Sequence, residues 1–336
     1  MKQYTGLWKK ITSFNNLYRA SRNAVKGAKR TAEVQEFLYN LEYELLLLKK
    51  ELLTETYLPS AYRTFTIFDP KQRIISAAPF RDRVLHHAVC DVIQPVLENI
   101  FSESSYACRK GKGTHRALKR ATSLMRKNDF FLKCDVRKFF NSVDHEFLKH
   151  FLEKRFKERE LLSLFGRIID EPVPGCKKNK GLAIGNLTSQ CFANLYLTGL
   201  DLMVLHQLKP CGYIRYMDDF VLFGSDKDEL HGFLYEITEF LGNNLKLTLK
   251  PEATFAAPVK HGLPFLGMQL FRSTVRVNGK SLKRLRKKLR WRTAQYLGGE
   301  LNDERYERSL SSIFGHLAHA DTLELRRTMC NSIPSV

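Results

Sequence analysis

The chain of 336 residues contains 55 Lys and Arg against 35 Asp and Glu, which gives a formal net charge of +20. An excess of this size favours a polyanionic partner, because neutralising phosphates releases condensed counterions. Nucleic acid is expected ahead of an anionic membrane, although composition also allows a basic surface without a partner. The longest apolar block, Leu45 to Leu48, is too short to cross a bilayer, and no secretory pattern opens the chain.

The seven cysteines are scattered, and no two of them form a C-x-x-C pair. This spacing fits neither a zinc ribbon nor a disulfide framework. Reduced cysteines that mostly serve packing are typical of a cytoplasmic protein, so we expect that location and no membrane partner.

Residues 1–60 predict a helical N-terminal extension. Apolar side chains recur there at helical spacing and predict one buried face, made of Val34, Phe37, Leu38, Leu41, Leu45 and Leu48. Pro59 closes the region. Core packing explains this face, and so does binding of a partner protein or RNA.

Residues 61–274 predict an α+β core in which short strands and helices are interleaved. Strands are expected over 62–67, 130–136 and 265–271, a helix capped near Asp144 over 143–156, and a helical run over 187–208. Two apolar segments within 213–223 flank Asp218 and Asp219. This pattern predicts a β-hairpin with acidic residues at its tip.

The adjacent carboxylates of Asp218 and Asp219 are the most informative feature of the sequence. Neighbouring carboxylates repel each other, and a divalent cation such as Mg²⁺ offsets that repulsion. Asp135 ends its own predicted strand and supplies a third carboxylate if that strand pairs beside the hairpin. Three aspartates would hold two Mg²⁺ ions for an in-line phosphoryl displacement. A polar turn without any metal remains the alternative for two adjacent aspartates.

Residues 275–336 predict a basic helical region. Leu282, Leu285, Leu289 and Leu297 recur along one helical stripe. The cations between them are predicted to bind nucleic acid, foremost Lys283, Arg284, Arg286, Lys287 and Arg290. A solvated charged helix is the alternative for such a run.

Five further blocks, in order along the chain, join the Tyr216-Met217-Asp218-Asp219 stretch in resembling the motifs of reverse transcriptases. The first two resemble the fingers motifs: Lys71 to Ile75 followed by Pro79 to Val84, and then Ser105 to Thr114. Phe131 to Asp144 resembles the motif with the first catalytic aspartate, Gly181 to Gln190 the template and nucleotide-pocket motif, and Leu263 to Gly267 the primer grip.

This resemblance implies a right-hand polymerase with fingers and palm over 61–274 and a helical thumb over 275–336. It implies DNA synthesis on template RNA to give a cDNA product, from deoxynucleoside triphosphates, with two Mg²⁺ ions as cofactors. Asp135, Asp218 and Asp219 would be the catalytic metal ligands, assisted by the backbone carbonyl of Val136. The nucleotide-binding residues would be Lys71, Arg73, Val136, Phe140 as the steric gate, Ile184, Gly185 and Gln190.

The sequence of the pocket motif, Ile184-Gly185-Asn186-Leu187-Thr188-Ser189-Gln190, resembles that of the reverse transcriptases of diversity-generating retroelements. These prokaryotic systems rewrite a variable gene through error-prone copying at template adenines. Ile184 lies where many relatives carry a glutamine that seats the nucleotide, so its loss is expected to loosen discrimination. The resemblance also implies a structured retroelement RNA and a separate basic accessory protein as partners. Little chain follows the predicted thumb, which favours this class over intron enzymes with a maturase region.

Three alternatives remain at this level. A retron or antiphage-defence reverse transcriptase shares the same core motifs. An RNA-binding protein on an inactive palm is a different class, against which the three retained aspartates argue. A nucleotide cyclase with a related palm would carry a Gly-Gly-Asp/Glu-Glu-Phe turn, which this sequence lacks.

Overall fold

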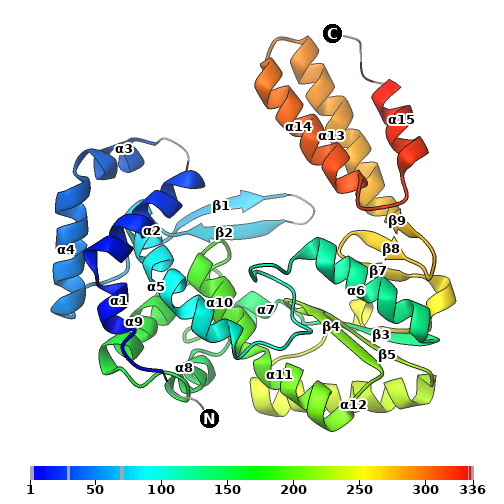
Figure 1. Cartoon of the computed structure of the whole chain (residues 1–336), viewed down its shortest axis with the longest axis horizontal. Coiled ribbons are helices and arrows are strands. Elements are labelled where there is room, and N and C mark those ends of the chain that lie inside the picture. The colour runs from blue at the N-terminus through cyan, green and yellow to red at the C-terminus, as the bar shows by residue number, and fades with distance from the viewer. Residues whose placement is uncertain (1–3, 29–30, 69–71, 332, 334–336) are drawn as a thin grey trace.

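The computed structural model describes residues 4–28, 31–68, 72–331 and 333. Helices from the first part of the chain and helices from its end lie on opposite sides, with a sheet below and between them (Figure 1). No helix among the described residues is both long and apolar enough to span a membrane.

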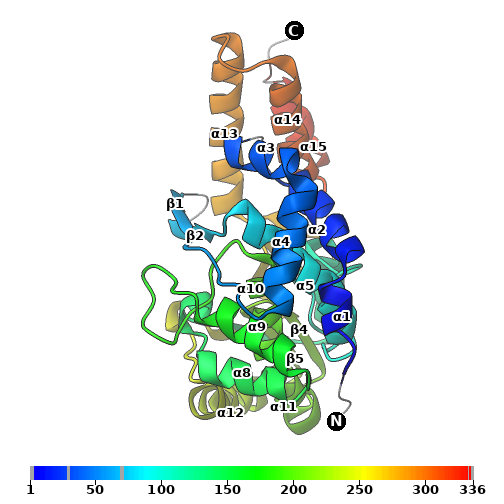
Figure 2. The same cartoon turned by 90° about the vertical axis from the view of Figure 1, so that its left-hand side faces the viewer.

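The N-terminal region is helical, as predicted, but its Leu-rich segment forms two helices rather than one. The four helices are α1 (Trp8–Ile11), α2 (Phe14–Lys26), α3 (Ala32–Tyr39) and α4 (Leu41–Leu53). Asn40 leaves helical geometry and separates α3 from α4. The break turns Leu38 out to 37% exposure, so its predicted burial is wrong, and it leaves Leu41 only half-buried. Val34, Phe37, Leu45 and Leu48 are buried as predicted. In Figure 2, α4 lies on the side that faces the viewer, and α2 packs against it.

A two-stranded hairpin follows, formed by β1 (Arg63–Ile67) and β2 (Arg73–Ala77) in antiparallel pairing. It extends from the N-terminal helices toward the C-terminal ones (Figure 1). Its base packs against a central helical layer. That layer comprises α5 (Phe80–Glu98), α7 (Phe139–Ser142), α8 (His145–Glu153), α9 (Arg159–Asp170), α10 (Leu187–Tyr196) and α11 (Thr198–Met203). α6 (Thr114–Lys127) follows α5 in the chain but packs in a different hydrophobic cluster.

Local sequence explains the boundaries of two of these helices. Asp144 caps α8 as expected, because its carboxylate accepts a hydrogen bond from the Phe147 amide at 3.2 Å. The run predicted helical over 187–208 is α10, then α11, and then a π-helical turn over Val204–Leu208. Lys209 ends the run in a left-handed conformation.

The central sheet has the strand order β4-β5-β3-β6 and is antiparallel throughout. Its strands are β3 (Phe130–Asp135), β4 (Gly212–Tyr216), β5 (Asp219–Gly224) and β6 (Phe255–Pro258). The register pairs Asp135 with Asp219 and Tyr216 with Asp219. The predicted acidic hairpin is thus β4–β5, and the predicted strand that ends in Asp135 is its direct neighbour.

Side-chain alternation divides the sheet into two faces. On one face, Leu132, Cys134 and Leu222 pack with α10, α11 and α12 (Lys227–Leu245) in the main core. On the other face, Phe131 and Val221 pack with α6 and with the strands of a second, smaller sheet. Asp135 lies four residues after Phe131 on β3, and Asp219 lies two residues before Val221 on β5. Alternate side chains of a strand point to the same face, so the carboxylates lie on this second face.

The predicted single strand over 265–271 is wrong. The chain forms β7 (Leu263–Phe265) and β8 (Met268–Leu270), which pair with each other and, through β8, with β9 (Val275–Val277). Leu266 and Gly267 both have positive φ, at 49° and 83°, and make the tight turn between β7 and β8. The Leu-Gly pair is the local signal for that turn.

Three helices complete the chain: α13 (Gly279–Leu297), α14 (Asp303–Leu317) and α15 (Leu323–Asn331). Leu285 and Leu289 are buried among them as predicted, and Leu282 is half-buried. Leu297 is 65% exposed at the end of α13, so its predicted place on the buried stripe is wrong. Asp321 joins this unit to β9: its carboxylate accepts from the Val275 amide at 2.7 Å, and its own amide donates to the Val275 carbonyl at 2.8 Å.

Candidate active site

The three predicted catalytic aspartates lie together at one end of the central sheet. Asp135 and Asp219 are direct cross-strand partners, and Asp218 occupies the turn between β4 and β5. The Val136 amide donates to the Asp218 carbonyl at 3.2 Å, which ties the end of β3 to that turn. Met217 shapes the turn with a φ of 57°, in the left-handed region that a side chain disfavours. Backbone register, rather than any chance side-chain contact, therefore brings these carboxylates together.

Proximity and burial alter the acidity of these groups. The pKa of Asp218 is raised to about 6, chiefly by burial and also by the negative charges of Asp135 and Asp219, while Arg73 acts in the opposite direction. Burial also raises the pKa of Asp219, and Asp135 adds to that effect, whereas Lys133 opposes it. The site thus concentrates negative charge that only cations can neutralise.

Lys133 supplies one such cation from within the sheet. It lies two residues before Asp135 on the same face of β3, and its ammonium donates to the Asp219 carboxylate. The same ammonium lies 5.8 Å from the centre of the Phe265 ring on β7. Among the described residues, no group of three or more acidic, His or Cys side chains is arranged as a ready metal cage.

The fingers-like hairpin contributes Arg73 and contacts the predicted nucleotide pocket. Arg73 begins β2, is exposed, and lies near enough to Asp218 to lower the pKa of that carboxyl group. The Ser76 amide of β2 donates to the Ile184 carbonyl at 3.1 Å. Gly185 has a φ of 115°, and a Cβ there would lie 3.0 Å from a methyl carbon of Ile75. Glycine therefore allows the hairpin to lie close against the pocket loop.

The other predicted nucleotide-binding residues are placed around this junction. Phe140 is half-buried on α7, beside Phe139, and its carbonyl accepts from the Leu182 amide at 2.7 Å. Gln190 is half-buried in the first turn of α10. A pocket between the hairpin and the palm includes Arg73 and Ile184 in its lining, but neither Phe140 nor Gln190. Lys71 lies outside the described residues.

Comparison with known proteins places this site in a family. The model of the reverse transcriptase (RNA-dependent DNA polymerase) family matches residues 68–270, more than half of the chain. The chain belongs to this family. The match contains all three aspartates, so this is the domain of an RNA-directed DNA polymerase.

Two curated relatives show the breadth of this reverse transcriptase family. Protein YkfC of Escherichia coli (strain K12) is 24% identical over 280 residues, which cover 70% of this chain and 73% of YkfC. The group II intron-encoded protein LtrA of Lactococcus lactis subsp. cremoris is 23% identical over 301 residues, which cover 68% of this chain and 50% of LtrA. This reverse transcriptase thus spans only half the length of LtrA.

The fold is also that of solved reverse transcriptases. Telomerase from Candida albicans, solved with the TWJ fragment of telomeric RNA, superposes with a TM-score of 0.50 at 12% identity. That match covers 82% of this chain and 55% of the telomerase. At this identity the likeness shows the shared fold, and it confirms the predicted α+β reverse transcriptase architecture.

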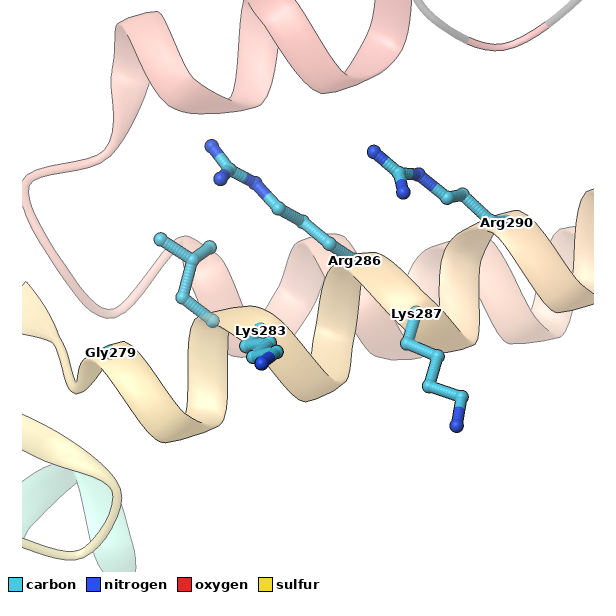
Figure 3. A pocket seen from close by; sticks show the side chains of 6 residues that line it. Gly279, Lys283, Arg286, Lys287 and Arg290 are labelled. Atoms are coloured by element: carbon cyan, nitrogen blue, oxygen red, sulfur yellow. The ribbon is translucent and has the colours of Figure 1, made fainter.

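The predicted nucleic-acid-binding residues of this reverse transcriptase lie on α13, but not all on one side. Lys283, Arg286, Lys287 and Arg290 are exposed and line a shared groove with Gly279 and Leu282 (Figure 3). Arg286 and Arg290 extend nearly parallel in that view, whereas Lys287 points to the other side of the helix. Arg284 is half-buried, and its charge helps lower the pKa of His316 on α14 after the larger effect of burial. Arg284 thus lies on the side of α13 that packs within the helical unit.

Sequence reasoning missed two charged residues at the centre of this reverse transcriptase. Lys133 and Arg215 both lie within otherwise apolar strands. A cation in such a strand is unusual, and this pattern could have marked both residues as candidates from the sequence. Arg215 is fully buried on the sheet face opposite the carboxylates. Its contacts form a network beneath the turn between β4 and β5.

Proposed function

We propose that this chain synthesises DNA on an RNA template with two Mg²⁺ ions held by Asp135, Asp218 and Asp219. The observation that carries the proposal is the register that sets Asp135 opposite Asp219 beside the Asp218 turn. Hard carboxylate oxygens are the donors that Mg²⁺ prefers. The pKa of Asp218 is raised chiefly by burial and further by the negative charges of Asp135 and Asp219, a repulsion that such ions would relieve. The donor set therefore fits the ions. When bound, they would stabilise charge on the attacking and leaving oxygens.

The protein's own groups would position the other reactant. Arg73, opposite Asp218, brings positive charge to the triphosphate of the incoming nucleotide, and Lys71 is proposed to act with it. Phe140 would exclude a ribose 2′-hydroxyl, while Val136, Ile184, Gly185 and Gln190 would bound the nucleotide. Template RNA and the cDNA product would contact the exposed cations of α13.

The role of the carboxylates is separable from template binding. We expect Asp135→Asn to abolish primer extension, because the neutral amide replaces one of three anionic donors. Template affinity, measured by fluorescence anisotropy on a labelled RNA–DNA hybrid, should remain within about twofold of the wild type, since Asp135 faces the metals and not the phosphates. Loss of both properties together would instead indicate a folding defect.

Within the family, we propose that this enzyme is of the diversity-generating type and errs at template adenines. The sequence of the pocket motif around Ile184 supports this proposal. The half-buried position of Ile184, in the junction between β2 and the pocket loop, supports it as well. The aliphatic side chain of Ile184 offers no polar contact to the nucleotide. A structured retroelement RNA and a separate basic accessory protein would be the partners, in a prokaryotic cytoplasm.

The product sequence tests this assignment. Wild type should give errors concentrated at template adenines, and Ile184→Gln should lower that fraction, because a glutamine amide restores a polar contact. Deep sequencing of cDNA made with and without cognate RNA and accessory protein measures both. Errors spread evenly over the four template bases would remove the subfamily while leaving the polymerase.

A second candidate within the same chemistry comes from the relative LtrA, which is described as group II intron-encoded. An intron-type enzyme would copy an intron RNA, and its errors would not be expected to concentrate at template adenines. A retron or defence enzyme would share the active site but prime differently. The error spectrum of the cDNA distinguishes an intron-type enzyme from the diversity-generating type. The identity of the co-purified RNA distinguishes a retron or defence enzyme from it.

A further inference from the structure

A buried ion pair lies beneath the catalytic turn. Arg215 of β4 and Asp201 of α11 both have fully buried side chains. The guanidinium donates to both carboxylate oxygens, from Nε to Oδ1 at 2.7 Å and from Nη2 to Oδ2 at 2.6 Å. Removing two charges from water is expensive, and a well-packed apolar pair is often at least as stable. Stability alone therefore does not account for this pair.

The remaining nitrogen of Arg215 reaches the catalytic turn. Nη1 donates to the Met217 carbonyl at 3.1 Å and to the Asn194 side-chain oxygen at 3.2 Å. Met217 has the left-handed φ of 57°, and its carbonyl belongs to the peptide that leads into Asp218. A strained turn keeps its shape only when surrounding contacts over-determine it. The guanidinium supplies such a contact from the sheet face opposite the carboxylates.

Other groups hold the guanidinium in place. The Tyr213 hydroxyl donates to the Asp201 Oδ1 at 2.8 Å, and the Asn194 amide donates to the Ala107 carbonyl at 2.9 Å. Next to this network, the Arg215 amide donates to the Ser104 carbonyl at 2.8 Å, and the Arg215 carbonyl accepts from the Tyr106 amide at 2.9 Å. Helices α10 and α11 and the segment 104–107 thus fix one side chain, whose free end fixes the turn.

We propose that Arg215 is a positioning residue for catalysis: held by Asp201 and Asn194, it fixes the Met217 peptide and so the direction in which Asp218 and Asp219 present their carboxylates. This inference rests on the proposed polymerase function for its activity readout. It does not rest on that function for metal binding, which the carboxylates would show on their own.

Arg215→Lys tests the geometry while keeping the charge. A lysine can pair with Asp201, but its single ammonium cannot match a planar fork that serves Asp201, Asn194 and Met217 together. We expect kcat for primer extension to fall at least about tenfold while the KM for nucleotide stays within about threefold. The Mg²⁺ concentration for half-maximal activity should rise at least about threefold, since misdirected ligands bind the ion more weakly.

Tyr213→Phe is the matched control. It removes a hydrogen bond to the same buried Asp201 but leaves the contact between Arg215 and Met217 intact. A merely structural network predicts that both variants lower the melting temperature and leave kcat per folded molecule and the Mg²⁺ requirement unchanged. A positioning role predicts changes in both kinetic quantities that are much larger for Arg215→Lys than for Tyr213→Phe, because only the first substitution removes the donor to the Met217 carbonyl.

Mn²⁺ binding, followed by electron paramagnetic resonance on the full chain, provides a readout that needs no DNA synthesis. Wild type should bind Mn²⁺, Asp218→Ala should lose that binding, and Arg215→Lys should weaken it at least about threefold. If Arg215→Lys binds Mn²⁺ more weakly than wild type while the wild type makes no DNA, the positioning role is retained and the polymerase function is removed. Equal binding and equal kcat in Arg215→Lys and wild type would overturn the positioning role, and so would a wild type that binds no Mn²⁺.

Discussion

At the scale of single residues, Asp218 is a charge that the fold tolerates for function. Its folded pKa of about 6 lies above its ordinary value of 3.8, so the folded protein holds the proton more tightly than the unfolded chain. The resulting stability is fully present below about pH 4 and is lost as the pH rises through 6. At pH 8 without divalent ions, the ionised carboxylate therefore opposes folding.

Asp218→Asn tests this conflict. We expect the free energy of unfolding at pH 8, in the presence of a chelator, to rise by about 1–3 kcal/mol, because the shift of roughly two pKa units corresponds to at most about 3 kcal/mol. The same substitution should abolish DNA synthesis. Urea titrations at pH 8 and pH 4.5 measure the effect, and the gain should fall to roughly a third at the lower pH, where the carboxyl group of the unfolded chain is still mostly ionised. An equal gain at both values would show that charge is not its cause.

Residue types that carry chemistry were predictable where the signal is local. Asp218 and Asp219 are adjacent in the sequence, and Asp135 ends an apolar run, so a metal-ligand set could be inferred before the strands were paired. Lys133 and Arg215 were not found, because their roles depend on strand register and on which face of the sheet each side chain occupies. Those two facts arise from pairing with β5 and packing on α11, which are contacts between distant segments.

At the scale of elements, the β1–β2 hairpin is positioned by one close approach to the pocket loop. Ser76 on β2 is hydrogen-bonded to Ile184, and Gly185 provides the space that Ile75 needs. This junction links the proposed nucleotide-binding cation Arg73 to the pocket.

Gly185→Ala should disturb that junction. A side chain at a φ of 115° is strained, and the added Cβ would crowd Ile75, so we expect a loss of about 1–3 kcal/mol in stability and a raised KM for nucleotide. Gly166→Ala is the control, because Gly166 lies in α9 with ordinary φ and open space around its Cβ position. That variant should be neutral or gain up to about 1 kcal/mol. Steady-state kinetics and thermal unfolding compare the two; an unchanged KM in Gly185→Ala would contradict the proposed coupling.

Most strands and helices could be predicted from periodicity, and the errors have identifiable local causes. The break between α3 and α4 occurs at Asn40, a residue that leaves helical geometry readily, and the overlooked turn between β7 and β8 is a Leu-Gly pair with two positive φ angles. Leu297 follows the helical period but is the last residue of α13 and lies outside the packed cluster of these helices. Periodicity specifies a face, and only the partner helices determine how far that face is covered.

At the scale of the whole molecule, the net charge of +20 is partly organised along α13. Exposed cations there differ from those on α14 and α15, where Arg308 and Arg327 are paired with Glu304 and Glu324 on their own helices. The positive field of these exposed cations is what a phosphate backbone would neutralise.

Salt dependence of binding distinguishes these two classes of cation. Arg286→Gln/Arg290→Gln should weaken binding to an RNA–DNA hybrid and reduce the slope of log K against log salt by about 1.5, because about two phosphate contacts are lost. Arg308→Gln/Arg327→Gln, with the same change in net charge, should alter the slope much less. Identical slopes for the two double variants would indicate that α13 has no dedicated nucleic-acid contact.

The central claim is that the carboxylates of β3 and the β4–β5 turn carry RNA-templated DNA synthesis. Its most direct test is primer extension on an RNA template with Mg²⁺ and all four deoxynucleotides, comparing wild type with Asp218→Ala/Asp219→Ala. We expect full-length cDNA from wild type and none from the double variant, with hybrid binding retained in both. Synthesis that survives the double substitution would contradict the account, and so would tight binding without any synthesis by the wild type, with or without its cognate RNA and accessory protein.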